Sequence, residues 1–189
     1  MNHLFFIHYL YMLLEIYLLS MILKTKNLTL RHWSELDAEC LYHFAKNPKI
    51  GPIAGWPPHE SVEYSLNIIK TVFNRKETYA VVKNNVPIGS AGLLIHPDGN
   101  HWWGEGACEL GYWIAEEYWG RNYACEASEI LIKRAFNDLN IQKIYATYRC
   151  NNIASKRVLE KLGFNYYTQL NNIDYLGRPF REIAMLLEK

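Results

Sequence analysis

The sequence has no excess of charge of either sign. Its 189 residues include 20 Lys and Arg against 19 Asp and Glu, so the formal net charge is +1. Proteins that bind nucleic acid usually carry a basic excess, and the composition therefore predicts no nucleic-acid partner. Cysteine is also scarce, with four residues and no C-x-x-C pair. This excludes a disulfide scaffold and a zinc ribbon, and it favours a reducing, cytoplasmic setting.

Several motifs of phosphate and metal chemistry are missing as well. The sequence contains no G-x-G-x-x-G, which excludes a dinucleotide-binding fold of the usual kind, and it contains no P-loop. His96 and His101 form a His-x-x-x-x-His pair, but no third ligand stands at a credible spacing. We therefore expect no metal site.

Half of the residues are hydrophobic and 21% are charged, as in an ordinary globular protein, yet one apolar run is long. It covers residues 4–23, LFFIHYLYMLLEIYLLSMIL, which as a helix would span roughly 30 Å. No Lys or Arg precedes it, and Glu15 and His8 would share one polar stripe, which argues against a membrane span. A helix that packs on the domain or on a partner is the first interpretation, a membrane anchor the second, and a natural start at Met21 the third. We divide the chain into an apolar extension, residues 1–20, and one domain, residues 21–189.

The domain alternates between strand and helix patterns. We expect strands at residues 28–32, 78–83, 86–96, 106–115, 144–150, 164–170 and 179–187, and helices at 35–44, 60–75, 123–139 and 153–162. Ser34 and Asp37 predict a capping box for the first helix. Its apolar face is expected to contain Leu36, Cys40, Leu41 and Phe44. Residues 47–59, with four Pro and two Gly, predict an ordered loop and not a helix. The strand–helix–strand unit from Glu109 to Cys150 favours a parallel pair within a mixed α/β domain.

The junction between the strand at 106–115 and the helix at 123–139 has the pattern of an anion site. Gly120 and Asn122 are the residue types that most readily adopt a positive φ. Such a turn directs backbone N–H groups outward at a helix N-terminus, and Arg121 adds a positive charge. Taken alone, however, the turn fits an ordinary loop-to-helix connection better than a ligand site.

Two longer segments change this interpretation. ELGYWIAEEYWGRNYACEA, followed by IYATYRCNNIASKRVLEKLGF, resembles the GNAT (Gcn5-related) acetyltransferases, in particular the branch of the ribosomal-protein-alanine N-acetyltransferases. The resemblance covers residues 21–189, from ILKTKNLTLR to YLGRPFREIAMLL near the end. It implies a central, twisted, mostly antiparallel sheet in which one parallel strand pair splays to bind acetyl-CoA, flanked by about four helices.

The family's cofactor loop, Gln/Arg-x-x-Gly-x-Gly/Ala, falls on residues 119–124. Trp119 stands where Gln or Arg is usual, and Asn122 where the second glycine of the loop is usual; both departures bear on cofactor affinity and not on the fold. The resemblance assigns the following residues to acetyl-CoA: Tyr112, Trp113 and Ile114 on the strand, Arg121, Asn122, Tyr123 and Ala124 in the loop, and Asn152 and Ser155 at the next helix. The loop amides would hold the pyrophosphate, the strand and Asn152 the pantetheine arm, and Ser155 would lie near the thioester sulfur.

Acetyl transfer from a thioester to an amine needs a proton acceptor, a donor to the carbonyl oxygen and a donor for the thiolate. Glu109 is our candidate base, acting through a water, with an exposed structural glutamate as an equal alternative. The backbone N–H near Ile114 would polarise the carbonyl. Ser155 is the candidate donor, because Leu159 stands where some relatives carry a tyrosine acid; an ordinary serine in the first turn of a helix is its alternative.

The sequence therefore predicts an enzyme, an acetyl-CoA-dependent N-acetyltransferase that acts directly on a primary amine. A protein N-terminal α-amine, with a pKa of about 7.7–8.0, suits a weak base such as Glu better than lysine at about 10.4 does. An aromatic and acidic rim that suits a cationic amine is formed by His96, Asp98, His101, Trp102, Trp103 and Glu105, with Trp56 in the proline-rich segment. A small-molecule acceptor such as an antibiotic or a polyamine, a non-catalytic coenzyme-A-binding module and a homodimer all stay open.

Overall fold

The computed structural model describes residues 22–99 and 101–189, so the predicted extension at residues 1–20 lies outside the described residues. The strands are β1 (Leu23–Lys24), β2 (Thr29–Arg31), β3 (Thr78–Lys83), β4 (Val86–Ile95), β5 (Ala107–Ile114), β6 (Lys143–Arg149), β7 (Asn165–Ile173) and β8 (Pro179–Glu188). The α-helices are α2 (Ala38–Ala45), α3 (Gly51–Ala54), α4 (Val62–Thr71), α5 (Tyr123–Asn137) and α6 (Ile153–Lys161), with 3-10 turns η1 (Glu35–Asp37) and η2 (Glu116–Tyr118). Within the described ranges, no helix is long and apolar enough to cross a membrane.

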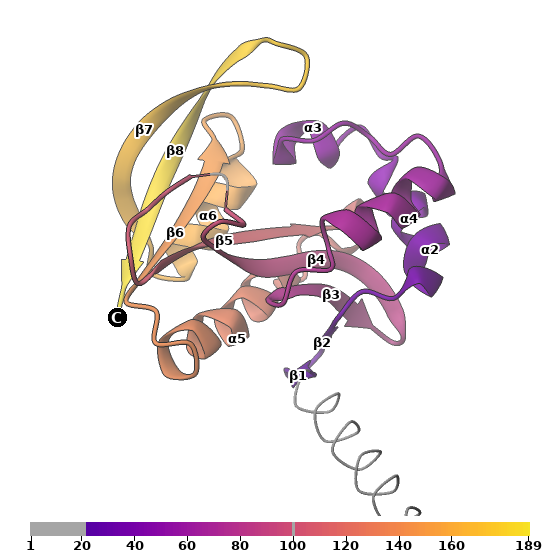
Figure 1. Ribbon diagram of the computed structural model, residues 1–189, viewed down its shortest axis with the longest axis horizontal. Helices are drawn as coiled ribbons and strands as arrows, with labels where there is room; N and C mark the ends of the chain where they lie inside the picture. Colours follow the sequence, from indigo (N-terminus) through magenta and orange to yellow (C-terminus); the bar gives the residue numbers. More distant parts are fainter. Residues whose placement is uncertain (1–21, 100) are drawn as a thin grey trace, which may run out of the picture.

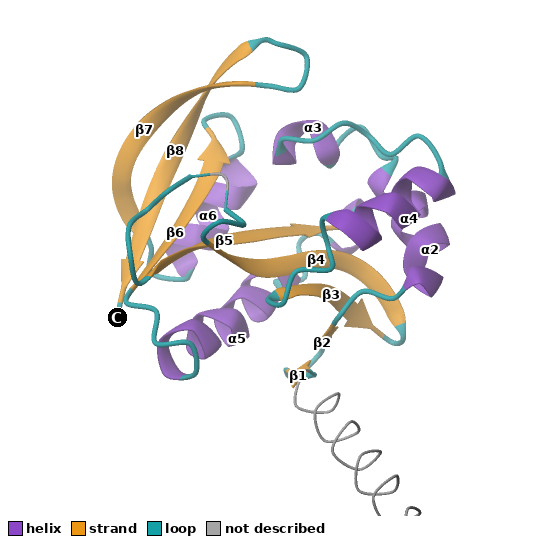
Figure 2. Ribbon diagram, viewed as in Figure 1, coloured by secondary structure: helices purple, strands orange, loops and turns teal. Residues whose placement is uncertain are grey.

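The eight strands form one sheet in the order β1-β2-β3-β4-β5-β6-β8-β7 (Figure 1). Every neighbouring pair is antiparallel except β5 and β6, which are parallel. Figure 2 shows β6, β7 and β8 turned steeply against β3, β4 and β5. The predicted mixed fold, with a mostly antiparallel sheet and one parallel pair, is confirmed.

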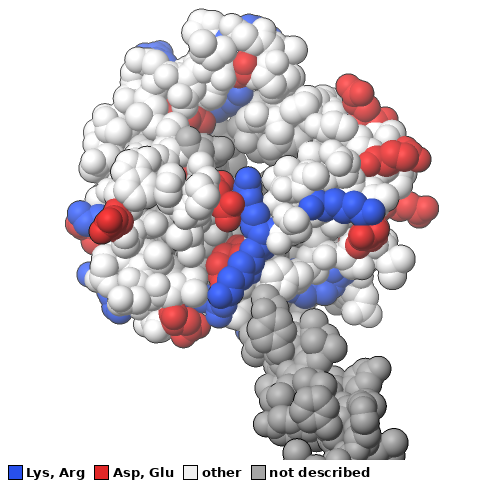
Figure 3. Space-filling model, in the orientation of Figure 1, with Lys and Arg blue, Asp and Glu red and all other residues white. Residues whose placement is uncertain are grey.

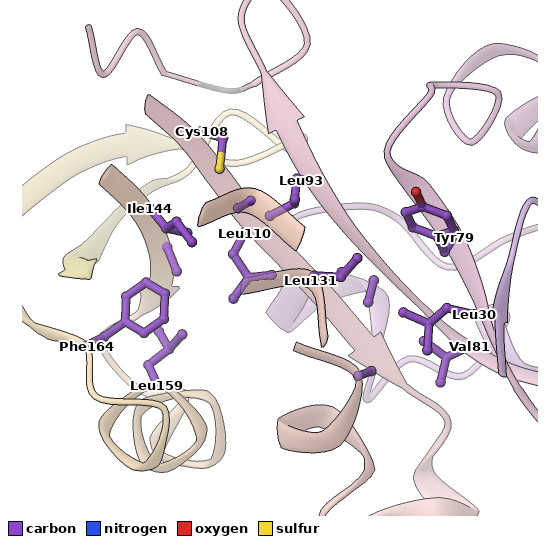
Figure 4. Packing of buried hydrophobic residues seen from close by; sticks show 14 of the residues in the cluster. Leu30, Tyr79, Val81, Leu93, Cys108, Leu110, Leu131, Ile144, Leu159 and Phe164 are labelled. Atoms are coloured by element: carbon purple, nitrogen blue, oxygen red, sulfur yellow. The ribbon is translucent and has the colours of Figure 1, made fainter. Parts of the chain in front are cut away.

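Helices cover the two faces of the sheet and enclose two apolar clusters. On one face, Leu110 of β5, Leu131 of α5 and Leu159 of α6 belong to one cluster, and Figure 4 shows Leu159 beside Phe164. On the other face, Leu41 of α2 and Ile69 of α4 belong to the second cluster. Successive residues of a strand point to opposite faces, so β5 presents its even-numbered side chains to α5 and α6 and its odd-numbered ones to α2 and α4.

Two local expectations are wrong. The proline-rich segment contains a helix, α3, because Pro52 lies in its first turn, where a missing N–H costs no hydrogen bond, and Gly55 ends it at a φ of 98°. The described residues therefore contain five α-helices and not four. Leu36 is 93% exposed although Ser34 and Asp37 do form the predicted capping box. The box begins a 3-10 turn, whose three residues per turn rotate Leu36 away from the face that α2 buries.

A buried ion pair fixes α5 to the sheet. Glu77, next to β3 and 4% exposed, accepts hydrogen bonds from Arg134 Nε at 2.6 Å, from Arg134 Nη2 at 2.9 Å and from the Tyr79 hydroxyl at 2.8 Å. Burial alone would raise the pKa of Glu77, but these hydrogen bonds hold the pKa below its usual value. The pair thus sets the position of the helix whose N-terminus follows the predicted anion loop.

Candidate active site

One edge of β5 opens halfway along the strand. The pairing with β6 ends at Glu109↔Tyr145, whereas the pairing with β4 continues to Gly89↔Ile114. The Ala115 N–H donates to β4, so the Ile114 carbonyl points to the opposite, open side, as does its N–H. This is the splayed parallel pair that the sequence predicts. Its open side presents backbone groups that an extended ligand arm can pair with.

The loop after β5 has the predicted positive-φ turn. Gly120 has a φ of 73°, and Asn122 caps α5 at a φ of 64°. A Cβ added to Gly120 would meet nothing within 4 Å, so the outer side of the loop is open. The first amides of α5 have no acceptor within the helix, and the Glu126 N–H begins the ladder by donating to the Asn122 carbonyl. Arg121 is exposed, with its guanidinium 5.6 Å from the centre of the Tyr118 ring. This geometry is compatible with the predicted anion site.

Both residues that depart from the family pattern have partners of their own. Trp119 Nε1 donates to the Ile114 carbonyl at 2.6 Å, which ties the loop to the end of β5. Asn122 Oδ1 accepts a hydrogen bond from Lys161 Nζ at 2.7 Å, so its carboxamide is turned toward α6. This contact holds an exposed ammonium at the rim of the anion site.

Asn152 and Ser155 stand at the N-terminus of α6, opposite the open edge. Asn152 Oδ1 accepts the Ser155 N–H at 3.0 Å, so this side chain caps the helix and its NH2 group takes no part in the cap. Ser155 Oγ lies 3.0 Å from the Tyr112 hydroxyl, which also donates to the Ser155 carbonyl at 3.3 Å. Burial raises the pKa of Tyr112, so the phenol stays protonated at neutral pH. Tyr112 thus joins β5 to Ser155.

Glu109 belongs to a cluster of aromatic and acidic side chains on the α2–α4 face. It is 4% exposed and accepts a hydrogen bond from Trp103 Nε1 at 3.2 Å, so the alternative of an exposed glutamate is wrong. The Trp103 ring stacks on Tyr145 with the ring centres 4.3 Å apart. His101 Nε2 lies 3.9 Å from Glu182 Oε2. Burial, with the nearby charge of Glu109, raises the pKa of Glu182.

A cavity of about 310 Å³ lies on the same face, beside Glu109 along β5. Its floor consists of Thr78, Ser90, Gly92, Leu94, Gly111 and Trp113 from three adjacent strands. Its walls are largely aromatic and aliphatic side chains from α2, α4 and the segment between them, and Trp56 meets Trp113 with the ring centres 5.9 Å apart. His59 lines the cavity too; burial lowers its pKa to about 4, and its Nδ1 lies 2.8 Å from Ser65 Oγ. Figure 3 shows the surface hollowed between the β7–β8 hairpin and the segment with α3.

The predicted acceptor rim divides into two parts. Trp103 contacts Glu109, and His101 contacts Glu182. Asp98 instead forms an ion pair with Arg75 at 3.4 Å. The exposed members are Asp98, Glu105, His96 and Trp102, and the rings of the last two are in contact. Among the described residues, no group of three His, Cys, Asp or Glu side chains is arranged to hold a metal ion.

Sequence reasoning missed several residues at this site. Tyr145 and Glu182 belong to strands that only the sheet order brings beside Glu109, so no local pattern points to them. Thr78 reads as an ordinary strand residue. Lys161 stands in the last turn of α6, where a lysine is expected for the helix dipole alone.

Two solved structures have the same architecture. A Vibrio cholerae protein with a provisional assignment as a ribosomal-protein-serine acetyltransferase superposes with a TM-score of 0.73 at 21% identity, covering 89% of this chain and 97% of that chain. The microcin C7 self-immunity acetyltransferase MccE, solved with acetyl-CoA and AMP, has a TM-score of 0.73 at 17% identity and covers 87% and 93%. The fold is therefore that of an acetyltransferase.

The family follows from the sequence match. Residues 27–165 match the model of the acetyltransferase (GNAT) domain, and the chain belongs to this family. The uncharacterized N-acetyltransferase YoaA of Bacillus subtilis (strain 168) is 28% identical over 162 residues, which is 84% of this chain and 92% of that protein. The predicted family is confirmed, and the protein is an acetyltransferase.

Proposed function

We propose that the protein transfers an acetyl group from acetyl-CoA directly to an uncharged primary amine, with an α-amine such as a protein N-terminus as the acceptor. One observation carries the proposal: the open edge of β5 lies between the anion loop on one side and the cavity beside Glu109 on the other. An arm that ends at this edge and an amine that enters over the face would meet at the same strand.

The residues around the open edge fit acetyl-CoA. The N-terminus of α5 suits the pyrophosphate, because its first amides lack helical acceptors and the outer side of Gly120 is open. Lys161 and Arg121 add positive charge at the rim. The open side of β5, together with the NH2 group of Asn152, suits the amide groups of the pantetheine arm. When bound, acetyl-CoA supplies the acetyl group as an activated thioester.

Each remaining requirement of the reaction has a residue near that edge. Glu109 takes the proton of the incoming amine through a water, since it lies two residues from Gly111 on the same face of β5 but does not line the cavity. The Ile114 N–H, on the open side, donates to the carbonyl oxygen. Ser155 donates a hydrogen bond to the leaving sulfur, which is protonated on release as the free thiol, and the Tyr112 hydroxyl at 3.0 Å orients the Ser155 side chain.

The proposal is tested by measuring thiol release from acetyl-CoA with peptide α-amines, lysine-like amines and a polyamine. Glu109→Gln should lower kcat/KM and change its pH profile, whereas the control Glu39→Gln, at an exposed position on α2, should change neither. If Glu109→Gln leaves the pH profile unchanged, the base assignment is wrong. Calorimetric binding of acetyl-CoA without turnover on any amine would refute the enzymatic proposal and support a non-catalytic binding module.

A further inference from the structure

The cavity beside β5 is built by an unusual row of small side chains. Thr78 of β3, Gly92 of β4 and Gly111 of β5 stand opposite one another across three strands, so two of the three positions carry no side chain. The next row carries Ser90 and Trp113, and the row on the other side carries Glu109. The middle of the floor is therefore hollow between an indole and a carboxylate.

The two glycines have different reasons to be there. A Cβ on Gly92 would lie 2.9 Å from the Glu77 carbonyl oxygen, so close packing of the backbone demands glycine. A Cβ on Gly111 would meet nothing within 4 Å, and its φ is not positive. Glycine weakens a strand interior, and it is common where a ligand approaches the backbone closely. No neighbouring atom among the described residues explains Gly111.

Two polar atoms of the lining have no partner among the described residues. The hydroxyl of Thr78, a residue that is 6% exposed, is buried and makes no hydrogen bond. The indole N–H of Trp113 is likewise buried and makes no hydrogen bond. Trp113 can only donate, so it requires an acceptor atom, and Thr78 can donate to one as well. A buried polar group without a partner is costly, and a ligand oxygen in the cavity would satisfy it.

The electrostatics of the cavity oppose a second positive charge. The described residues that line it include no Asp or Glu, and Arg75, in its lining, lies 3.4 Å from Asp98. His59 is neutral at pH 7, because burial lowers its pKa to about 4. The carboxylates of the site, Glu109 and Glu182, lie outside this lining, where a reacting amine would meet them.

We propose that this cavity is a specificity pocket for the acceptor, which takes an uncharged aromatic or branched aliphatic side chain next to the reacting α-amine. Trp113 Nε1 and Thr78 Oγ1 hydrogen-bond the carbonyl oxygen of the same residue or of the next one. The acceptor class is therefore an apolar amino-acid amide or a peptide that begins with an apolar residue, and not a polyamine. This inference rests on the proposed function, of which it names the substrate class.

The test compares four probes in the thiol-release assay: phenylalaninamide, glycinamide, 2-phenylethylamine, which lacks the carbonyl, and spermidine. Phenylalaninamide should exceed glycinamide and spermidine by at least about tenfold in kcat/KM. Equal rates for the two amides, or a preference for spermidine, would refute the proposed specificity pocket but not the acetyltransferase activity. Loss of turnover on every amine would instead refute the proposed function. Calorimetric titration of phenylalaninamide into the protein loaded with CoA, which carries no acetyl group to transfer, then tests the pocket by itself, and an absence of binding refutes it.

Substitutions at two pocket positions, Thr78 and Gly111, separate the pocket from the fold. Thr78→Val keeps the shape of the side chain and removes a hydroxyl without a partner, so the urea midpoint of unfolding should stay the same or rise. The KM for phenylalaninamide should rise about five- to tenfold, whereas the KM for 2-phenylethylamine should stay constant. Thr78→Ser should restore the KM for phenylalaninamide, because serine keeps the hydroxyl. Thr29→Val on β2, outside the lining of the cavity, is the matched control. Gly111→Ala should reduce the preference for phenylalaninamide over glycinamide severalfold in a protein that still folds. Equal KM increases for phenylalaninamide and 2-phenylethylamine in Thr78→Val would refute the assigned hydrogen bond.

Discussion

Replacing Asn122 by glycine should tighten the binding of acetyl-CoA while changing stability little. Asn122 has a φ of 64° and a ψ of 13°, and its Oδ1 holds the Lys161 ammonium at 2.7 Å. Glycine adopts this left-handed conformation without penalty, so the loop keeps its shape. The variant removes the amide from the rim of the anion site and releases the ammonium toward a phosphate.

The size of the effect follows from the exposure of both partners. A unit charge pair at 4 Å in water is worth about 1 kcal/mol, so an ammonium that gains one phosphate charge should lower Kd about fivefold. Lys161 is exposed, and its hydrogen bond to Asn122 contributes little to stability, so the free energy of unfolding should change by less than about 1 kcal/mol. Asn122→Ala keeps the positive φ but lacks the short polar side chain that lets asparagine adopt it, and should lose about 1 kcal/mol.

Calorimetric titration with acetyl-CoA at low and high salt measures the gain, and urea unfolding measures the stability. The gain should shrink at high salt, because exposed charges are screened within about 10 Å at 0.1 M. It should also vanish when Asn122→Gly is combined with Lys161→Met. Weaker binding by Asn122→Gly, or a gain that persists in the double variant, would refute the reasoning.

Three further predictions concern side-chain contacts elsewhere in the protein. Arg134→Met leaves a buried carboxylate without its cation and should cost about 3–5 kcal/mol in urea unfolding. Lys70→Met, from the exposed pair with Glu35, should cost less than about 1 kcal/mol, and similar costs would contradict this. The pKa of His59 is about 4 in the folded protein and 6.5 unfolded, so the unfolded state binds more protons between these values. Stability should fall by up to roughly 3 kcal/mol as the pH drops from 6.5 to 4, and His59→Gln should remove that part of the slope in a series of denaturation curves. Trp119→Phe removes the donor to the Ile114 carbonyl and should weaken acetyl-CoA binding about fivefold in calorimetry; unchanged binding would show that the indole does not position the loop.

Local patterns predicted most of the fold. Asn84 and Asn85 predict a tight turn, and both residues do adopt a positive φ between β3 and β4. The segment from Glu109 to Cys150 predicts the parallel pair, because a strand, a helix and a second strand in succession leave few other arrangements. The failures at Leu36 and in α3 are also local, since a 3-10 turn and a four-residue helix lie below the length at which periodicity is informative.

The candidate site was predictable only where it follows the chain. Gly120 and Asn122 were identifiable because a positive-φ turn that leads into a helix is a local feature, and the structure has that turn. Glu182 was not identifiable, because it reaches the neighbourhood of Glu109 through β8, and the order β5-β6-β8 is a property of the whole sheet. Gly111 likewise could not be identified from the sequence, because it helps to form the cavity only through its pairing with Gly92 on the neighbouring strand.

The alternation of β5 explains how one strand serves two substrates. Tyr112 points to the face of α6 and reaches Ser155, on the side of the predicted cofactor arm, whereas Glu109, Gly111 and Trp113 point to the face with the cavity. A shift of one residue in register would exchange the two sets and destroy both sites. The long ladder with β4 excludes such a shift, so β5 keeps its register where the pairing with β6 ends. The open edge needed for the thioester arm and the fixed side chains needed for the amine therefore have one common cause, the unequal pairing of β5 with its two neighbours.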